Sequence, residues 1–341
     1  MQTPPGRSPT GGGRQDRETG MGVQGMDRVR IGISACLLGE NVRFDGGHKL
    51  DRYLRDTLGA CVEYVPVCPE VECGLGIPRE SMHLEGDPGR PRLVTTRTRR
   101  DLTDRMEAWA NRRTAELEKE GLCGFVFKSR SPSSGMERVN VFDGKGGQAV
   151  RKGSGIFARI FMEHFPLLPV EEEGRLQDPL LRENFIERIF ACRRWREISE
   201  SGRKPSNLVR FHSVHKLFIL AHSEKHYREM GKLVAGAGTI PAGELYARYE
   251  KLMMEALRLK ATPAKNANVL QHMAGYFKKQ LSAAERQELQ EVIGDYRRGD
   301  IPLIVPITLI RHYVRKFDEP YLSDQVYLNP HPQELKLRNH A

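Results

Sequence analysis

Two cysteines in this chain follow apolar runs of β-strand character, and a serine holds the third position of the same kind. Cys36 ends the first run, and Cys68 ends the second. The third run, at residues 124–129, leads into a serine-rich turn that contains Ser134. In an open α/β sheet, ligands bind in the crevice beyond the carboxyl ends of the strands. Three strand ends that meet there would place two thiolates and a hydroxyl around one soft metal centre.

Groups capable of proton transfer lie beside these positions. Glu70 follows Cys68 by two residues, and Pro69 stiffens the turn between them. A carboxylate at this point can act as a general base beside a metal, but a plain surface glutamate at a strand end accounts for the spacing equally well. The turn at residues 131–135 gathers several hydroxyls, which is also typical of a turn that satisfies its own backbone.

The chain is strongly basic. Its 341 residues carry a formal net charge of +10, and the pI is near 9.4. Such a charge favours a polyanionic partner, or it only keeps a solvated surface soluble, and net charge alone does not separate these alternatives. Much of the positive excess lies after Pro205, which is a further indication of nucleic acid.

The composition also bears on location. Residues 1–27 are rich in glycine and arginine and lack the apolar core of a secretion signal, so we expect a disordered extension. No apolar run approaches the roughly 20 residues that span a bilayer. We therefore expect a cytoplasmic protein with no membrane partner, in which thiols stay reduced. Its six cysteines are then candidate ligands or buried apolar residues rather than a disulfide framework.

The elements that would position these groups alternate between strand and helix in the first half. Their order predicts an α/β fold, a three-layer Rossmann-like sandwich around a mostly parallel sheet, followed by an all-α helical domain. The expected parts are the sandwich at residues 28–165, a connector with a helix at 166–207, the helical domain at 208–325 and a tail at 326–341. Helices are expected at residues 48–58, 101–120, 156–164, 180–198, 208–235, 242–259, 263–281, 283–298 and 304–317. An edge strand is expected at 91–96, and a flexible loop at 144–155.

Five short signatures give the first half a family resemblance. They lie at residues 33–39, 42–46, 67–70, 76–79 and 128–135. In this order they resemble the thiouracil desulfurase (TudS) family. The helical half resembles the YbgA-like domain, through residues 211–216, 221–223, 226–227 and 272–279. The fusion of the two is similar to RudS-type proteins, which remove sulfur from 4-thiouridine in tRNA.

The resemblance implies a non-redox desulfidase. In the family, three cysteines hold a [4Fe–4S] cluster with one open iron, which binds the sulfur of the substrate as a Lewis acid. A carboxylate activates the water that replaces this sulfur. Cys36 and Cys68 match two of the cluster ligands. Glu70 matches the base, and Ser131 matches a hydroxyl that orients or protonates the substrate. The side chains expected to contact the substrate are Arg43, Asp45 and Lys128.

The chain departs from the family at the third ligand, where Ser134 stands in place of a cysteine. A hydroxyl has a far higher pKa than a thiol and is a harder ligand, so it should hold a cluster less tightly. Three explanations stay open. Ser134 ligates as an alkoxide, Cys73 or Cys123 substitutes for it, or the cluster is absent or labile and the activity is altered.

Histidines and cations mark the helical half. His212, His215, His222 and His226 recur at intervals that place them on one face of the helix expected at 208–235. His222 and His226 have the spacing of a zinc pair, but no matching glutamate motif follows, so packing or phosphate contact is favoured over metal.

Cations in the helical half are candidates for RNA contact. An aromatic and cationic run that includes Lys278 and Lys279 is typical of RNA-binding surfaces. Arg311 and Arg315 add further cations along the same half. The alternative is that Phe277 belongs to the core and the lysines are merely solvated.

Together these observations predict an iron–sulfur-dependent desulfidase that acts on thiolated uracil, with 4-thiouridine in tRNA as the expected substrate. Two alternatives stay open. One is a nucleic-acid-binding protein whose first domain is catalytically impaired by Ser134. The other is a desulfidase for free thiouracil, whose helical domain only supports oligomerisation. The sequence does not reveal the oligomeric state.

Overall fold

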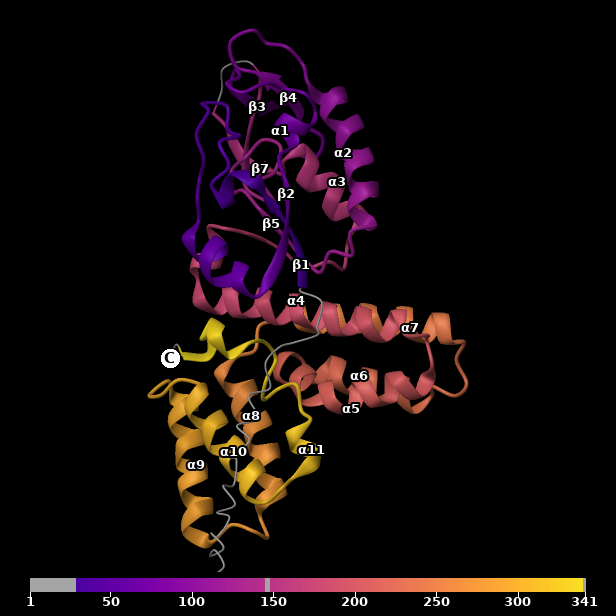
Figure 1. The fold of residues 1–341 in the computed structure, drawn as a ribbon, viewed down its shortest axis with the longest axis vertical. Coiled ribbons are helices and arrows are strands. Elements are labelled where there is room, and N and C mark those ends of the chain that lie inside the picture. Colours follow the sequence, from indigo (N-terminus) through magenta and orange to yellow (C-terminus); the bar gives the residue numbers. More distant parts are fainter. Residues whose placement is uncertain (1–28, 145–147, 340–341) are drawn as a thin grey trace, which may run out of the picture.

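The computed structural model describes residues 29–144 and 148–339, and it divides into an α/β region and a helical region (Figure 1). The long helix α4 (Pro179–Glu200) lies between the two. The extension predicted at residues 1–27 lies outside the described residues.

A parallel sheet forms the centre of the α/β region. Its strand order is β2 (Val62–Val67), β1 (Val29–Ser34), β5 (Phe125–Phe127) and β8 (Val170–Glu172). Neighbouring strands are all parallel, as the alternating sequence predicts. Gly32 leaves the room that Phe125 of the next strand needs, because a Cβ atom there would lie 2.2 Å from its ring.

Helices cover both faces of this sheet, which confirms the predicted three-layer arrangement. Helices α2 (Thr103–Glu118) and α3 (Ile156–His164) share a core with Phe125 and Phe127 on one face. On the other face, β1 and α4 belong to a core that continues into the helical region. Instead of the short helix expected at 48–58, a single π-helical turn forms at Tyr53–Thr57.

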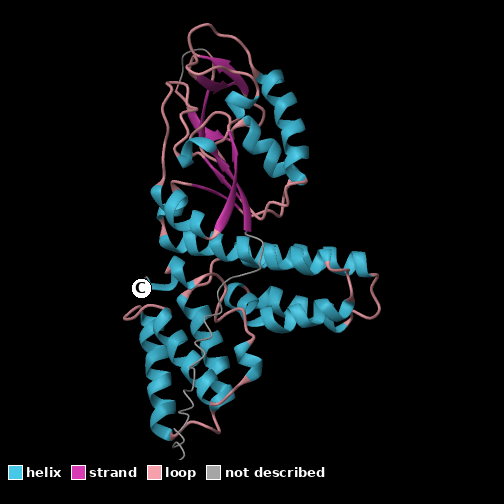
Figure 2. Cartoon of the chain, viewed as in Figure 1, coloured by secondary structure: helices cyan, strands magenta, loops and turns pink. Residues whose placement is uncertain are grey.

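A second, mixed sheet was not predicted. Its order is β4 (Arg92–Thr95), β3 (Met82–Glu85), β6 (Val139–Phe142) and β7 (Val150–Gly153). Figure 2 shows that the strands, in magenta, are confined to the α/β region. The strand expected at 91–96 is confirmed as β4. The prediction of a flexible loop at 144–155 is wrong where β7 pairs with β6. Each of these strands has only four residues, so the apolar pattern is too short to predict most of them, although Leu84, Val139 and Val141 are buried in the core.

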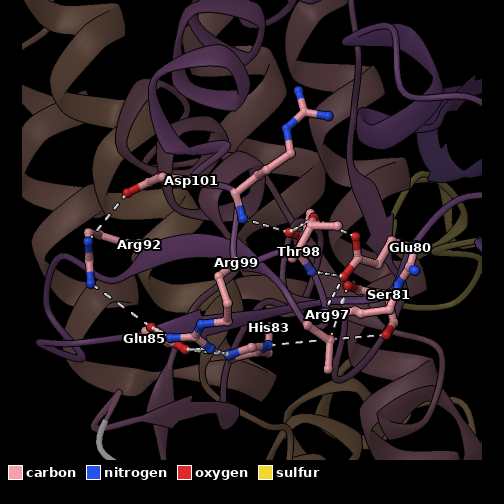
Figure 3. Close-up of polar contacts among 12 residues, drawn as sticks. Glu80, Ser81, His83, Glu85, Arg92, Arg97, Thr98, Arg99 and Asp101 are labelled. Atoms are coloured by element: carbon pink, nitrogen blue, oxygen red, sulfur yellow. Dashed lines mark hydrogen bonds and ion pairs between the residues drawn. The ribbon is translucent and has the colours of Figure 1, made fainter.

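Ionic contacts hold the β3–β4 hairpin of this second sheet (Figure 3). Glu85 is only 2% exposed, and its carboxylate pairs with His83 and Arg99. Glu80 accepts hydrogen bonds from the backbone N–H and the hydroxyl of Thr98, each at 2.7 Å. These charges are therefore paired within the hairpin.

The segment expected to be a connector is part of the folded core. Residues 170–172 form β8, and α4 buries Phe185 and Trp195 in the core shared by both regions. The acidic composition concealed the strand, because two of its glutamates are buried and paired. Glu171 bonds Arg175 at 2.5 Å, and Glu172 accepts from a backbone N–H at 2.7 Å.

The helical region contains more breaks than expected. Ser223 ends one helix and caps the next with its side chain, so residues 208–235 form two helices. The helix expected at 263–281 ends at Ala274, and a 3-10 turn follows. The helices here are α5 (Pro205–His222), α6 (Glu224–Ala235), α7 (Ala242–Arg258), α8 (Pro263–Ala274), α9 (Ala283–Arg298), α10 (Ile304–Lys316) and α11 (Pro320–Ser323).

The tail packs against these helices. Tyr327 is fully buried, and the N–H of Val326 donates to the carbonyl of Val214 on α5 at 2.9 Å. Short 3-10 turns follow at Gln333–Leu335 and Leu337–Asn339. No helix in the described residues combines the length and the apolar character needed to cross a membrane.

Candidate active site

Three neighbouring strand ends supply the groups singled out in the sequence. Cys36 lies in a 3-10 turn (Ala35–Leu38) directly after β1, and Cys68 lies between β2 and the one-turn helix α1 (Pro69–Glu72). Ser134 lies in the turn after β5. Because β1 pairs with both β2 and β5, the three turns are adjacent. All three side chains line one cavity of about 320 Å³.

Most of the other expected site residues line the same cavity. They are Arg43, Glu70, Lys128 and Ser131. Asp45 instead lies outside the cavity with a half-exposed side chain, 3.6 Å from the Nε atom of Arg43. Its Oδ1 atom accepts from the N–H of Gly47 at 3.1 Å, so Asp45 shapes the turn. The expectation that Asp45 contacts the substrate is therefore not supported by its position.

A hydrogen-bonded chain connects the cysteine to the serine turn through Glu70. The Cys68 thiol donates to Glu70 Oε2 at 3.5 Å. Ser133 donates its hydroxyl proton to Glu70 Oε1, and the hydroxyls of Ser133 and Ser131 lie 2.9 Å apart. Arg79, whose side chain is 9% exposed, lies 3.7 Å from Glu70 Oε2. The carboxylate thus has both a cation and a hydroxyl path beside it.

The amino end of α3 holds the serine turn in place. The backbone N–H groups of Ser133 and Ser134 both donate to the Ser131 hydroxyl, at 3.3 and 3.1 Å. Gly155 lies so close to this turn that a Cβ atom would come within 2.4 Å of the Ser133 carbonyl carbon. Only glycine permits this approach, which fixes the direction of the hydroxyls.

Lys128 is paired on the cavity wall. Its ammonium group forms an ion pair with Glu173, which follows β8. Glu173 also accepts from the backbone N–H of Ser129 at 2.7 Å, and the Lys128 N–H donates to Ser34 at 2.9 Å. Lys128 therefore reaches the cavity as an anchored and largely neutralised cation.

The donor atoms permit a test of whether an iron–sulfur cluster fits. Burial, together with the nearby Glu70 carboxylate, raises the pKa of Cys36 to about 11 and that of Cys68 to about 12. Such thiols stay protonated unless a metal displaces the proton. Two sulfur donors and one hydroxyl face the cavity, so the set fits a cluster with one harder, weaker ligand.

Neither proposed substitute ligand lies at this cavity. The Cys73 thiol donates to the Glu70 carbonyl at 3.3 Å and packs against the core with α2 and α3. Cys123 precedes β5, and its N–H donates to the carbonyl of Arg30 near the start of β1. Cys123 therefore lies near the start of β1, whereas Cys36 follows the end of that strand. The suggestion that Cys123 replaces Ser134 is therefore contradicted, and the position of Cys73, which is not among the residues lining the cavity, does not support it as a substitute.

Three of the four histidines singled out in the helical half are buried. His212, His215 and His222 are at most 8% exposed. This excludes phosphate contact and agrees with packing. His222 and His226 belong to different helices, so the expectation that all four share one helix face is wrong.

The predicted RNA-contacting cations do not all lie on the surface. Lys278, Lys279 and Arg315 are exposed. Arg311 is half-buried and donates to the Leu328 carbonyl and to Asn329, so it anchors the tail. Phe277 is fully buried, as the alternative interpretation expected.

Three residues of the site had no assigned role in the sequence interpretation. Ser133 and Arg79 lie within the signatures at 128–135 and 76–79, but nothing in their spacing reveals that both contact Glu70. Glu173 was placed in a connector. Glu173 follows β8, so its ion pair with Lys128 depends on the pairing of β8 with β5, which the sequence did not predict.

The comparisons with known proteins match two separate parts of the chain, one before α4 and one after it. Residues 31–173 match the family model described as 2-thiouracil desulfurase. Residues 216–332 match the model described as a protein of unknown function, DUF1722. The chain is also similar to the uncharacterised protein YbgA of Escherichia coli strain K12. The two are 35% identical over 153 residues, which is 45% of this chain and 90% of that protein.

The chain belongs to the family of YbgA, and it joins this domain to a 2-thiouracil desulfurase domain. Among solved structures, it is similar to the [4Fe-4S]-dependent thiouracil desulfidase TudS, with 29% identity and a TM-score of 0.37. That similarity covers 44% of this chain and 95% of the other.

Proposed function

We propose that the protein is a desulfidase that removes sulfur from thiolated uracil, with 4-thiouridine in tRNA as its substrate. One observation carries the proposal. Cys36, Cys68 and Glu70 line a single cavity with the hydroxyls of Ser131 and Ser134. The family match over residues 31–173 and the cluster dependence of TudS support the same chemistry.

Cys36, Cys68 and Ser134 would hold the [4Fe–4S] cluster at the strand ends. When bound, the cluster supplies an open iron, which acts as a Lewis acid toward the sulfur of the substrate. The remaining residues bind, orient and move protons. These roles rest on the contacts around Glu70.

Glu70 is the general base in this proposal, because its carboxylate borders the cavity, Arg79 lies 3.7 Å from it, and the Ser133 hydroxyl gives it a proton path. That path leads through Ser133 to Ser131, 2.9 Å away, which is placed to protonate or orient the thiolated base. Arg43 and the exposed Phe44 form the outer lining and would contact the base.

The polymeric substrate is proposed from charge. The chain carries a net charge of +10, and Lys278, Lys279 and Arg315 are exposed on the helical region. Binding of several phosphates would make the affinity fall steeply with salt, whereas binding of a free base would not.

The proposal is tested by anaerobic reconstitution with iron and sulfide. Iron, acid-labile sulfide and desulfuration of 4-thiouridine-containing tRNA and of free 4-thiouracil are then measured. We expect cluster incorporation and conversion of the tRNA, both lost in Cys36→Ala. Cys73→Ala is the matched control, because Cys73 faces the core outside the cavity, and it should retain both.

One alternative has a specific observation in its favour. Ser134 gives the third position an oxygen donor, which favours a nucleic-acid-binding protein with an impaired first domain. Salt-sensitive tRNA binding without iron incorporation or desulfuration would support this alternative and contradict the proposal.

A further inference from the structure

A second group of ionisable side chains lies buried below α4, far from the cysteines in sequence. Glu183 and Glu187 come from α4, His222 ends α5, and His331 lies in the tail. His222 is 1% exposed and Glu187 is 3% exposed. One ligand atom each from Glu183, Glu187 and His331 lie within 4.8 Å of one another.

The two imidazoles have their hydrogen positions set by carbonyl groups. His222 Nδ1 lies 2.7 Å from the Leu259 carbonyl oxygen, and His331 Nδ1 lies 3.1 Å from that of Pro332. A carbonyl oxygen can only accept, so each Nδ1 carries a hydrogen. In a neutral ring this leaves a lone pair on Nε2.

The lone pair of His222 faces another acceptor. His222 Nε2 lies 3.3 Å from Glu187 Oε2. Neither this atom nor His331 Nε2 has a hydrogen-bond partner within the described part of the chain. A lone pair directed at a carboxylate is unfavourable unless a positive charge lies between them.

Arg338 supplies part of that charge. Its Nε donates to Glu183 at 3.3 Å, and its Nη2 donates to Glu187 Oε1 at 3.0 Å. Its third contact is the carbonyl of Tyr327, at 2.7 Å. Arg338 therefore orients the two carboxylates, while Glu187 Oε2, which faces His222, has no arginine partner within the described residues.

We propose that this cluster binds a divalent transition-metal ion such as zinc, with Glu183, Glu187 and His331 as ligands and His222 beside them. Imidazole nitrogen and carboxylate oxygen are ordinary zinc ligands. Ligating histidines almost always donate their other N–H to a carbonyl or carboxylate, as both histidines do here. A cavity of about 60 Å³ borders Glu183 and Glu187, but neither histidine, and has room for a water beside the two carboxylates.

The site is distinct from the pair suggested by sequence spacing. His226 bonds Ser223 at 2.8 Å and takes no part in the cluster. The ligands come instead from α4 and the tail, so the metal would tie the C-terminal tail to the helix that joins the two regions.

The test is a cobalt(II) titration of the full-length protein, stripped of metal by chelation and exchanged into chelator-free buffer. Cobalt bound by nitrogen and oxygen gives visible bands without the sulfur-to-metal charge-transfer band that cysteine ligands produce. His331→Gln is the principal variant, because this half-buried ring is less costly to replace than Glu187. His272→Gln, at an exposed position of α8, is the matched control, and circular dichroism checks folding.

We expect one cobalt ion with an oxygen and nitrogen spectrum, displaced by zinc. The affinity should fall about tenfold or more in His331→Gln and stay unchanged in His272→Gln. Zinc should also raise the melting temperature of the wild-type protein. Two results would overturn the metal site: the only bound cobalt shows the sulfur band, or wild-type and His331→Gln bind cobalt with equal affinity. The positive charge between His222 and Glu187 would then be a proton.

Discussion

The cavity at the strand ends and the cluster below α4 both remove ionisable groups from water, but they do so in different ways. The first collects side chains from turns that follow parallel strands around a space of about 320 Å³. The second packs side chains from helices and the tail against one another, with Arg338 between two carboxylates, and only Glu183 and Glu187 of the cluster border a space of about 60 Å³. Turns at a sheet edge leave room for a substrate, whereas packed helices leave room for little more than an ion or a water.

The largest effect that distinguishes the two regions is expected at Glu70. Glu70→Gln keeps the size of the side chain but removes the base, so turnover should fall by about 10²- to 10⁴-fold. Iron and sulfide content should stay at the wild-type level. Single-turnover desulfuration of thiolated tRNA measures the loss.

Glu40→Gln, an exposed change in the loop after β1, is the matched control for that variant. Equal rates for the Glu70 variant and wild type would remove the base from the proposed chemistry.

The cluster below α4 is expected to matter for stability. Arg338→Met leaves Glu187 buried beside an apolar side chain, which should cost about 3–5 kcal/mol of unfolding free energy. Urea unfolding followed by circular dichroism measures it. Arg315→Met, at an exposed position of α10, should change it little, and a similarly small effect for Arg338→Met would show that the tail is not held by these ion pairs.

Acid should weaken the helical region through its buried histidines. Burial, with a smaller contribution from Lys216, lowers the pKa of His212 to about 4, and burial beside Arg194 lowers that of His215 well below its usual value. Since unfolded histidine titrates near about 6.5, the unfolded chain binds protons first as the pH falls. Stability is therefore lost from about pH 6.5 down to about pH 4.

Urea unfolding at a series of pH values tests this dependence. The hydroxyl of Tyr249 lies 3.1 Å from His212 Nδ1, so His212→Gln keeps an acceptor while removing the titration. The variant should show a shallower loss of stability between these pH values. An identical pH profile for variant and wild type would assign the acid sensitivity to other groups.

The smallest expected effect is longer retention of iron after a substitution at the third ligand position. Ser134→Cys replaces an oxygen donor by sulfur, so the reconstituted protein should retain iron several-fold longer during chelator challenge. Ser133→Cys is the matched control, because its side chain faces Glu70 and should bring no such gain. Equal iron loss from Ser134→Cys and wild type would indicate that this position does not ligate.

Some of the molecule was predictable because its signals are local. The apolar runs before Cys36 and Cys68 predict strands, and α9 matches the helix expected at 283–298, since a capping box begins it and a glycine ends it. Of the second sheet only β4 was expected, because strands such as β7 are short and carry few apolar residues. β8 was missed because its acidic residues resemble a solvated segment, and the backbone N–H of Met136 that satisfies Glu172 is distant in sequence.

By itself the sequence determined the parallel α/β order, the all-helical second half and the convergence of Cys36, Cys68 and the serine turn. These features follow from hydrophobic periodicity and turn residues, which are local patterns in the sequence. Only the tertiary structure decided that Cys123 lies at the wrong end of β5, that Ser133 and Arg79 meet Glu70, and that His331 faces Glu187. Those outcomes depend on contacts between residues far apart in sequence, whose distances follow from how the elements pack and not from their spacing.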